Sequence, residues 1–331
     1  MSVTVPEFYR AREDARAWVA VLINLAVVVF SGTIAWHIGT WWAYVLAFVL
    51  VGARGQALYI LQHEAMHNIL YTSNKTNERV GILLSAVLGT QFYAGRKIHW
   101  DHHRHVGHDE DPNEMFHNVE DRPPGIAVVK FFLFHLLGGR LLYLVRNLSM
   151  TLLEMTGLRK KPEGSRPSIP AAKARIDLVA LAAVQLVLLV TMTATSSFWV
   201  YVVLYVLPLS TLTAFFEAVR SFSEHVLPGQ ATCAAEEDRR FFMDCGPAER
   251  FFISQFDFHY HHVHHIHPNV PTFKVRALHH WLLENDASYQ DQFKVRPGYI
   301  GTALRYLFNR PFEGAGADYP RPQGLSMQPA E

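Results

Sequence analysis

Long apolar runs alternate along the chain with polar segments that are rich in histidine. The first two runs, residues 18–36 and 41–61, follow a polar segment of residues 1–17 and are separated by the short turn 37–40. Each run has about 20 residues, the length that an α-helix needs to cross the apolar part of a bilayer. The pattern therefore predicts two membrane-spanning helices joined by a tight turn.

Two further apolar runs lie in the second half of the chain. Residues 178–195 and 198–216 are separated only by Ser196 and Ser197. Pro208 lies inside the last run, where its missing N–H is expected to kink the helix. The four runs together predict an all-α integral membrane protein with four transmembrane helices in two hairpins.

The segments that follow each hairpin are more polar, and we expect them to form a helical cap. The cap comprises residues 62–177 and 217–310, so the membrane domain extends over residues 18–310 and leaves 311–331 as a loose tail. Within the cap, residues 126–144 are long enough to span but contain charged residues and glycines. We therefore expect an amphipathic helix lying at the membrane surface there.

The distribution of positive charge predicts which side of the membrane the cap faces. The two tight turns carry no lysine or arginine, whereas the N-terminal segment and the linkers carry many. By the positive-inside rule, the cap and both termini are expected on the cytoplasmic side, as in a protein of a bacterial inner membrane.

Composition excludes several classes of protein. Charged residues make up 18% of the chain and the formal net charge is +1, so nothing suggests a nucleic-acid partner. The two cysteines, Cys233 and Cys245, are too few for a disulfide scaffold, a cysteine-rich zinc site or a cysteine-ligated iron–sulfur cluster.

Histidine is concentrated just beyond the apolar runs. Nine histidines form the candidate metal-ligand set: His63 and His67; His99, His102 and His103; His225; and His261, His264 and His265. The second and third clusters share the spacing H-x-x-H-H, in which positions three and four apart lie on one helix face. Such a cluster can direct two rings toward one metal while the third turns toward another. Neutral imidazole is a common metal ligand, so the pattern predicts a metal centre.

The size of this set favours two metal ions. Nine imidazoles exceed the three or four ligands of a zinc site, and an all-imidazole set suits iron. A membrane zinc hydrolase remains an alternative, because His63–His67 reads HEAMH and Glu64 would be its base. A metal transporter is less favoured, because its ligands should lie inside the spans, whereas these histidines lie outside the apolar runs.

These motifs resemble the membrane fatty-acid desaturase and hydroxylase superfamily over residues 40–285 or so. The three histidine boxes of that superfamily read HEAMH, HWDHH and HHVHH here, and its R-x-F-x-E-H stretch reads RSFSEH, ending at His225. His259 and Val263 stand where many bacterial members have Asn and Glu. This departure keeps the box histidines and leaves the substrate class open.

The resemblance implies a cytosolic centre of two iron ions that uses dioxygen and external electrons. The implied reaction oxidises an unactivated C–H bond of a lipid or fatty-acyl-like substrate, with desaturation expected and hydroxylation or ketolation as alternatives. The sequence contains no cytochrome b5-type haem motif and no cysteine-rich electron-transfer segment. We therefore expect a separate ferredoxin- or cytochrome-type donor with its reductase.

Arg54 and Glu217 are lone charges in the second apolar run and directly after the fourth. Arg54 precedes His63 by nine residues and Glu217 precedes His225 by eight, which places both roughly 12–14 Å along the helix from a histidine. A charge inside a span is costly unless it is paired, so we predict an ion pair beneath the metal centre. The alternatives are separate contacts with the interface, or a substrate carboxylate bound to Arg54.

Overall fold

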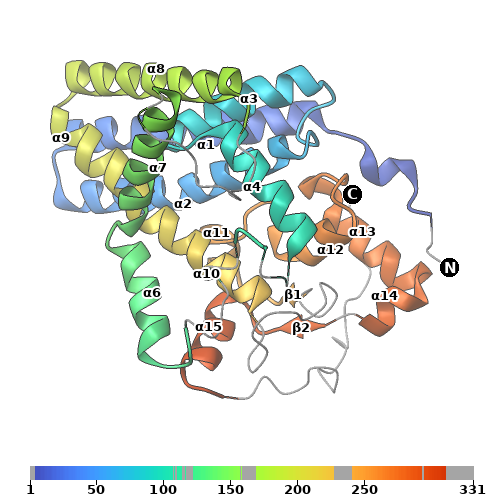
Figure 1. Cartoon of the computed structure of the whole chain (residues 1–331). Helices are drawn as coiled ribbons and strands as arrows, with labels where there is room; N and C mark the ends of the chain where they lie inside the picture. The colour runs from blue at the N-terminus through green and yellow to red at the C-terminus, as the bar shows by residue number, and fades with distance from the viewer. Residues whose placement is uncertain are drawn as a thin grey trace.

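The described part of the chain is mostly helical in the computed structural model (Figure 1). The structure describes residues 4–106, 108, 110–113, 116, 122–156, 158, 169–226, 241–292 and 294–310. The described residues also form one parallel pair of strands, β1 (Phe242–Met243) and β2 (Val295–Arg296). Each strand has two residues, which is too short to show an alternating pattern in the sequence. The predicted tail 311–331 and Cys233 lie outside the described residues.

Among the described residues, four long helices are apolar enough to cross a membrane. They are α1 (Asp14–Ile38), α2 (Trp41–Met66), α8 (Ala171–Thr195) and a continuous helix over Phe198–His225. Each contains a predicted run, but each also continues past it into polar sequence. A helix does not need to stop where the bilayer stops, so hydropathy marks the apolar part of these helices and not their ends.

The fourth of these helices changes its hydrogen-bond register around Pro208. Its parts are α9 (Phe198–Tyr201), the π-helical stretches η2 (Val202–Val206) and η3 (Leu209–Thr213), and α10 (Ala214–His225). Pro208 has no N–H to donate to the preceding turn. Just before it, the N–H of Leu207 donates to the carbonyl of Val202, five residues back. The distortion predicted at the proline therefore takes the form of wider helical turns.

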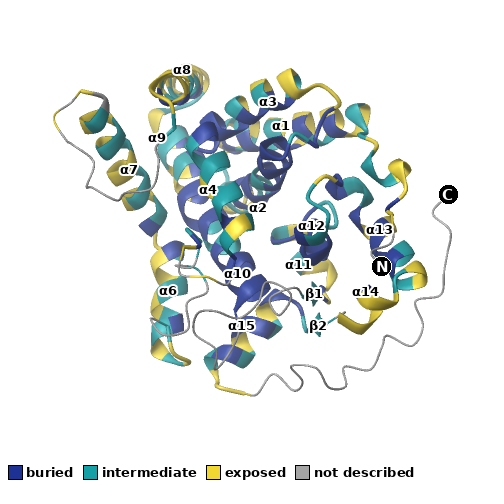
Figure 2. Ribbon diagram, turned by 45° about the vertical axis from the view of Figure 1, so that its right-hand side comes forward, coloured by how far each residue is buried: buried dark blue, intermediate teal, exposed yellow. Residues whose placement is uncertain are grey.

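Small residues let α2 lie directly against the fourth helix. A Cβ atom built on Gly55 would lie 2.3 Å from Oγ1 of Thr213, and one built on Gly52 would lie 2.5 Å from Cβ of Leu212. The Thr213 hydroxyl donates a 2.8 Å hydrogen bond to the carbonyl oxygen of Gly52. Figure 2 shows α2 and α10 as the largely buried centre of the molecule. This close packing holds the ends that carry the histidines near each other.

The helices that follow α2 are α3 (Asn74–Val87) and α4 (Phe92–His105). The hydroxyl of Ser73 accepts a hydrogen bond from the N–H of Thr76 and so caps the start of α3. One side of α3 is buried, with Leu84 among the core residues. α4 carries the second histidine box.

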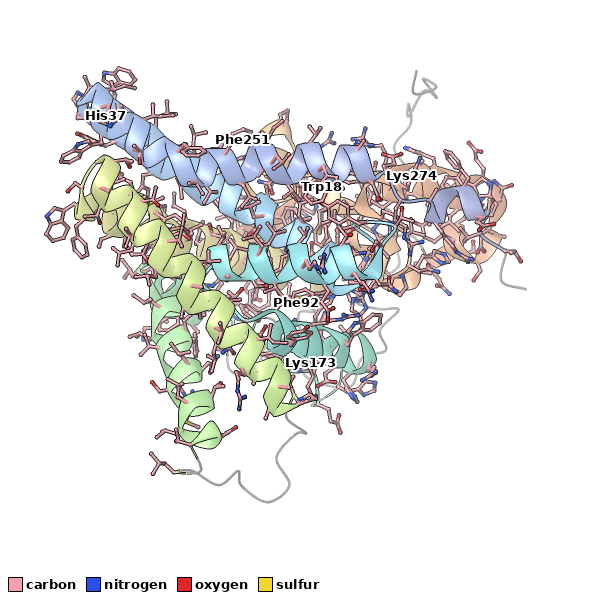
Figure 3. All side chains as sticks on the ribbon, turned by 90° about the horizontal axis from the view of Figure 1, so that it is seen from above. Trp18, His37, Phe92, Lys173, Phe251 and Lys274 are labelled. Atoms are coloured by element: carbon pink, nitrogen blue, oxygen red, sulfur yellow. The ribbon has the colours of Figure 1, made fainter. Side chains whose placement is uncertain are left out.

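A residue of α8 holds the first turn of α4. The buried carboxylate of Asp177 accepts hydrogen bonds of 3.0–3.3 Å from three consecutive N–H groups, those of Phe92, Tyr93 and Ala94. Figure 3 shows Phe92 beside Lys173 of α8, and the Lys173 ammonium lies 4.9 Å from the centre of the Tyr93 ring. These contacts fix where the helix of the second histidine box begins.

The prediction of one continuous surface helix over residues 126–144 is wrong. The structure has two helices there, α6 (Ile126–Leu136) and α7 (Gly139–Met155), bent by 68° with respect to each other. Gly138 has φ 87°, a left-handed conformation that ends α6. If this bent pair counted as one span, the described residues would hold five candidate spans in place of four.

Short helices complete the fold around the histidines. They are η1 (Glu7–Arg10), α11 (Pro247–Phe252), η5 (Phe258–Tyr260), α12 (His261–Ile266), α13 (Thr272–Asn285), α14 (Ala287–Gln292) and α15 (Tyr299–Leu307). Val263 of α12 is fully buried in one core cluster with Val270, which precedes α13, and Leu278 of α13. An apolar residue at position 263 therefore serves the packing of the helix that carries the third box.

Candidate metal centre

All nine candidate ligands meet at one place in the fold. Three groups have ligand atoms within 4.8 Å of one another: His63, His67, His99, His103 and His264; His102, His225 and His265; and Glu224, His225 and His261. The last two groups share His225, and Nε2 of His261 lies 3.0 Å from Nε2 of His265. We call the group of five histidines the first half of the centre, and we call His102, His225, His261 and His265 the second half.

Helical spacing explains how single boxes contribute to both halves. In α4, His99 and His103 are four residues apart and belong to the first half, while His102 belongs to the second. In α12, His261 and His265 are four apart and belong to the second half, while the remaining box histidine belongs to the first. The second and third boxes therefore each contribute to both halves, whereas both histidines of the first box belong to the first half.

The spacing of the ring nitrogens in the first half fits a metal ion. Nε2 of His67 lies 2.6 Å from Nε2 of His99 and 3.1 Å from Nε2 of His264. Nε2 of His103 lies 3.0 Å from Nε2 of His99. A metal with imidazole ligands at about 2.1 Å and right angles between them holds neighbouring nitrogens about 3 Å apart. The buried Nε2 atom of His63 has no hydrogen-bond partner among the described residues, which leaves it available as a ligand.

Burial keeps these imidazoles in the form that binds metals. It lowers the pKa of His67, His99 and His264 well below the usual range, and the neighbouring imidazoles lower it further. The pKa of His261 in the second half is lowered in the same way. These rings are therefore neutral at physiological pH, and each has one unprotonated nitrogen.

Two carboxylates orient rings of candidate ligands, and sequence reasoning missed this role for both. Oδ1 and Oδ2 of Asp111 lie 2.8 and 3.0 Å from Nδ1 of His102, so they accept a hydrogen bond from its N–H and leave Nε2 as the unprotonated nitrogen. Oε1 of Glu64 lies 3.3 Å from Nδ1 of His63, and Oε2 accepts a 2.7 Å hydrogen bond from the N–H of Thr272. The sequence signal was the placement of each carboxylate in or just after a histidine box.

Other histidines near the boxes have different surroundings. His262 lies between the candidate ligands His261 and His264 in the sequence of α12. Its Nε2 lies 2.8 Å from the hydroxyl of Tyr289, on the side of α12 that faces α14. Nδ1 of His279 lies 2.6 Å from the same hydroxyl. His105 is half-buried and His108 is exposed, and neither belongs to the three groups of possible ligands. His117 is not among the described residues.

The ion pair predicted between Arg54 and Glu217 is not formed. The guanidinium of Arg54 donates a 2.6 Å hydrogen bond to the carbonyl oxygen of Phe251 and lies 4.2 Å from the centre of its ring. Glu217 instead pairs with Arg220 at 2.6 Å and accepts a 3.0 Å hydrogen bond from Gln56. Gln56 lies close to Arg54 along α2, but two residues turn the helix by about 200°. The side chain of Gln56 therefore faces Glu217, and that of Arg54 points to another side.

The candidate spans and the buried histidine cluster define a class: an integral membrane protein with a site whose ligands suit two metal ions. Within that class, the sequence matches the Fatty acid desaturase family over residues 39–296, and the chain belongs to this family.

Curated relatives carry desaturase names and match part of the chain. It is 25% identical over 118 residues to "Omega-3 fatty acid desaturase, chloroplastic" of Glycine max, which is 36% of this chain and 26% of the relative. It is 26% identical over 132 residues to "Probable fatty acid desaturase DES1" of Sorghum bicolor, covering 38% and 34%. It is 35% identical over 92 residues to "Dihydrorhizobitoxine desaturase" of Bradyrhizobium elkanii, covering 27% and 26%. The matches span about a quarter to a third of the length of these relatives.

Proposed function

We propose that this protein is a membrane-bound, non-haem di-iron desaturase that acts on a lipid or fatty-acyl-like substrate. The observation that carries the proposal is the gathering of nine histidines into two adjacent halves, one with five and one with four imidazoles. Such a set can hold two ions side by side, and iron accepts an all-imidazole environment. The family and the names of the relatives support desaturation as the reaction.

The proposed ligands are the nine histidines of the two halves. When bound, iron supplies the redox chemistry with dioxygen that attacks an unactivated C–H bond. The residues of the chain keep the imidazoles neutral through burial and fix the ring of His102 through Asp111. The ring of Phe258 packs edge to face against His63 and tilted against His261, at 5.1 and 4.6 Å between ring centres, and places an apolar group on that side of the site.

The overall reaction requires electrons from another protein. Desaturation converts a CH2–CH2 unit into CH=CH, and dioxygen is reduced to water with two external electrons and two protons. We propose a ferredoxin- or cytochrome-type donor with its reductase as the source of these electrons, since the histidine site itself supplies none. Hydroxylation and ketolation remain alternative outcomes of the same site, and they differ in returning oxygen to the carbon.

We also propose that the spans form two hairpins and that the cap is cytoplasmic, in a bacterial inner membrane. Both turns between the paired spans lack lysine and arginine. The histidines of α2, α4, α10 and α12 must share one side of the membrane because they meet in one cluster. Reporter fusions after residues 120 and 170 should report the same side, and opposite sides would reject this topology.

A zinc hydrolase built on HEAMH fits the surroundings of Glu64 less well. Its two carboxylate oxygens face His63 and the N–H of Thr272, so the group is engaged in orienting a ligand. A hydrolase also needs three or four zinc ligands, while the first half alone offers five imidazoles. Glu64→Gln would disturb the ring of His63 in either case, so the identity of the bound metal decides between the two classes.

Turnover with a defined substrate tests the proposal. The purified protein in lipid nanodiscs would be supplied with acyl substrates of several chain lengths, dioxygen and a ferredoxin system, and the products analysed by mass spectrometry. A product lighter than the substrate by two hydrogens supports desaturation, and a product heavier by one oxygen indicates hydroxylation. A hydrolysis product without oxygen consumption would contradict the proposal. His264→Ala is the control that should be inactive. His262→Gln is the matched control that should stay active, because His262 contacts Tyr289 and is not a candidate ligand.

A further inference from the structure

A buried cluster of charges adjoins the second half of the centre. Arg220 of α10 donates from Nε and Nη2 to the carboxylate of Glu217, at 2.9 and 2.6 Å. Its Nη1 donates to Oε2 of Glu224. The side chains of Arg220 and Glu224 are 9% and 3% exposed, so one guanidinium contacts two carboxylates away from bulk water. A buried carboxylate is stabilised in its charged form by a nearby cation.

The two carboxylates differ in what else they face. Oε1 of Glu224 accepts a 3.0 Å hydrogen bond from the hydroxyl of Tyr299, and Oε2 lies 3.8 Å from Nε2 of His261. Glu224 also has a ligand atom within 4.8 Å of those of His225 and His261. Glu217 faces Gln56 instead and belongs to none of the possible ligand groups among the described residues. Glu224 is therefore the member of the cluster that reaches the histidines.

The histidine count leaves room for one more donor in the second half. The first half has five imidazoles and the second half has four, and two of these four, His225 and His261, form a group of possible ligands with Glu224. All are neutral ligands, so two divalent ions held by them alone would retain their full charge in a buried site. A carboxylate oxygen has more than one lone pair, so Oε2 of Glu224 can accept from Arg220 and still face a metal. Carboxylate oxygen is a common ligand of iron beside imidazole.

We propose that Glu224 is the fifth donor of the second metal position, beside the four histidines of that half. Arg220 and Tyr299 act as positioning residues, because each holds one oxygen of the carboxylate and together they fix its orientation. The inference rests on the proposed di-iron function. It makes the two positions chemically different, one with imidazoles alone and one with a negatively charged oxygen ligand.

Substitution of the two glutamates tests this assignment. Glu224→Gln removes the charge with little change of shape and keeps an oxygen that can accept from Arg220. Glu217→Gln is the matched control, because it alters the same guanidinium contact without a ligand atom near the histidines. Both variants and the wild type would be purified in detergent, checked for helix content by circular dichroism, and measured for iron per chain and by Mössbauer spectroscopy.

The expected result is selective loss at one position. The wild type should bind about two irons per chain, Glu217→Gln should keep them, and Glu224→Gln should fall toward about one iron. If Glu224→Gln retains both irons, the Mössbauer signal of one of the two must change, since its ligand field has changed. Two irons with unchanged spectra in Glu224→Gln would overturn the assignment, and so would an equal loss in both variants. A wild type that binds no iron would instead reject the di-iron function itself.

Discussion

Replacing Asp111 by asparagine should weaken metal binding in the second half without unfolding the protein. Both oxygens of Asp111 lie against the Nδ1 atom of His102, at 2.8 and 3.0 Å, and its side chain is buried. The carboxylate accepts a hydrogen bond from the Nδ1–H group and so keeps Nε2 unprotonated, which is the form that binds a metal. An asparagine must present its NH2 group at one of these two places, where it faces another donor. The imidazole then loses both its negative partner and its fixed tautomer.

The expected size of the effect follows from the kind of contact that is lost. Loss of such an orienting carboxylate lowers metal affinity about 10- to 100-fold, or about 1.4–2.7 kcal/mol. The assay is competition for iron with a chelator of known affinity, followed through iron per chain. Asp101→Asn is the control. Asp101 lies in α4 next to His102, but its carboxylate pairs with Lys97 and Arg104. Wild-type affinity in Asp111→Asn, or the same loss in Asp101→Asn, would refute the reasoning.

Three further predictions concern the start of α4, helix packing and the pH dependence of stability. Asp177→Ala should leave the first N–H groups of α4 without an acceptor and destabilise the protein by about 1–2 kcal/mol, seen as a lower midpoint of thermal unfolding in detergent; an unchanged midpoint would contradict this. Gly55→Val should separate α2 from the fourth helix and abolish the folded protein, whereas Gly246→Ala, whose added Cβ meets nothing within 4 Å, should be tolerated. Burial lowers the pKa of His279 to about 3, so the unfolded chain takes up this proton near pH 6.5 and stability falls as the pH drops from about 6.5 toward 3. His279→Gln should reduce the pH dependence of the unfolding midpoint over that range, and an identical dependence would show that His279 does not contribute.

The sequence was informative wherever a periodic pattern has one physical cause. The apolar runs located four spans because about 20 apolar residues match the thickness of a bilayer. The H-x-x-H-H spacing led to the expectation that one box contributes to two metals. The structure places His99 and His103 in one half and His102 in the other. The ends of the helices were not predictable, because α2 continues through His63 in a sequence that is no longer apolar.

Contacts between residues far apart in the chain were not predictable from patterns. Asp177 caps a helix that begins 85 residues earlier in the chain, and no sequence pattern near either position predicts this contact. Arg54 and Glu217 were matched by depth alone, while the rotation of each helix about its axis decided their actual partners. The break at Gly138 depends on a left-handed backbone conformation that glycine permits but does not require.

The metal content of the purified wild-type protein tests the central claim most directly. The protein would be produced in medium containing both iron and zinc, purified without added metal, and analysed for all transition metals per chain. The proposed function predicts about two irons per chain and little zinc, with iron lost together with activity in His102→Ala and His264→Ala. A single zinc per chain, or full iron content in both of these variants, would contradict it.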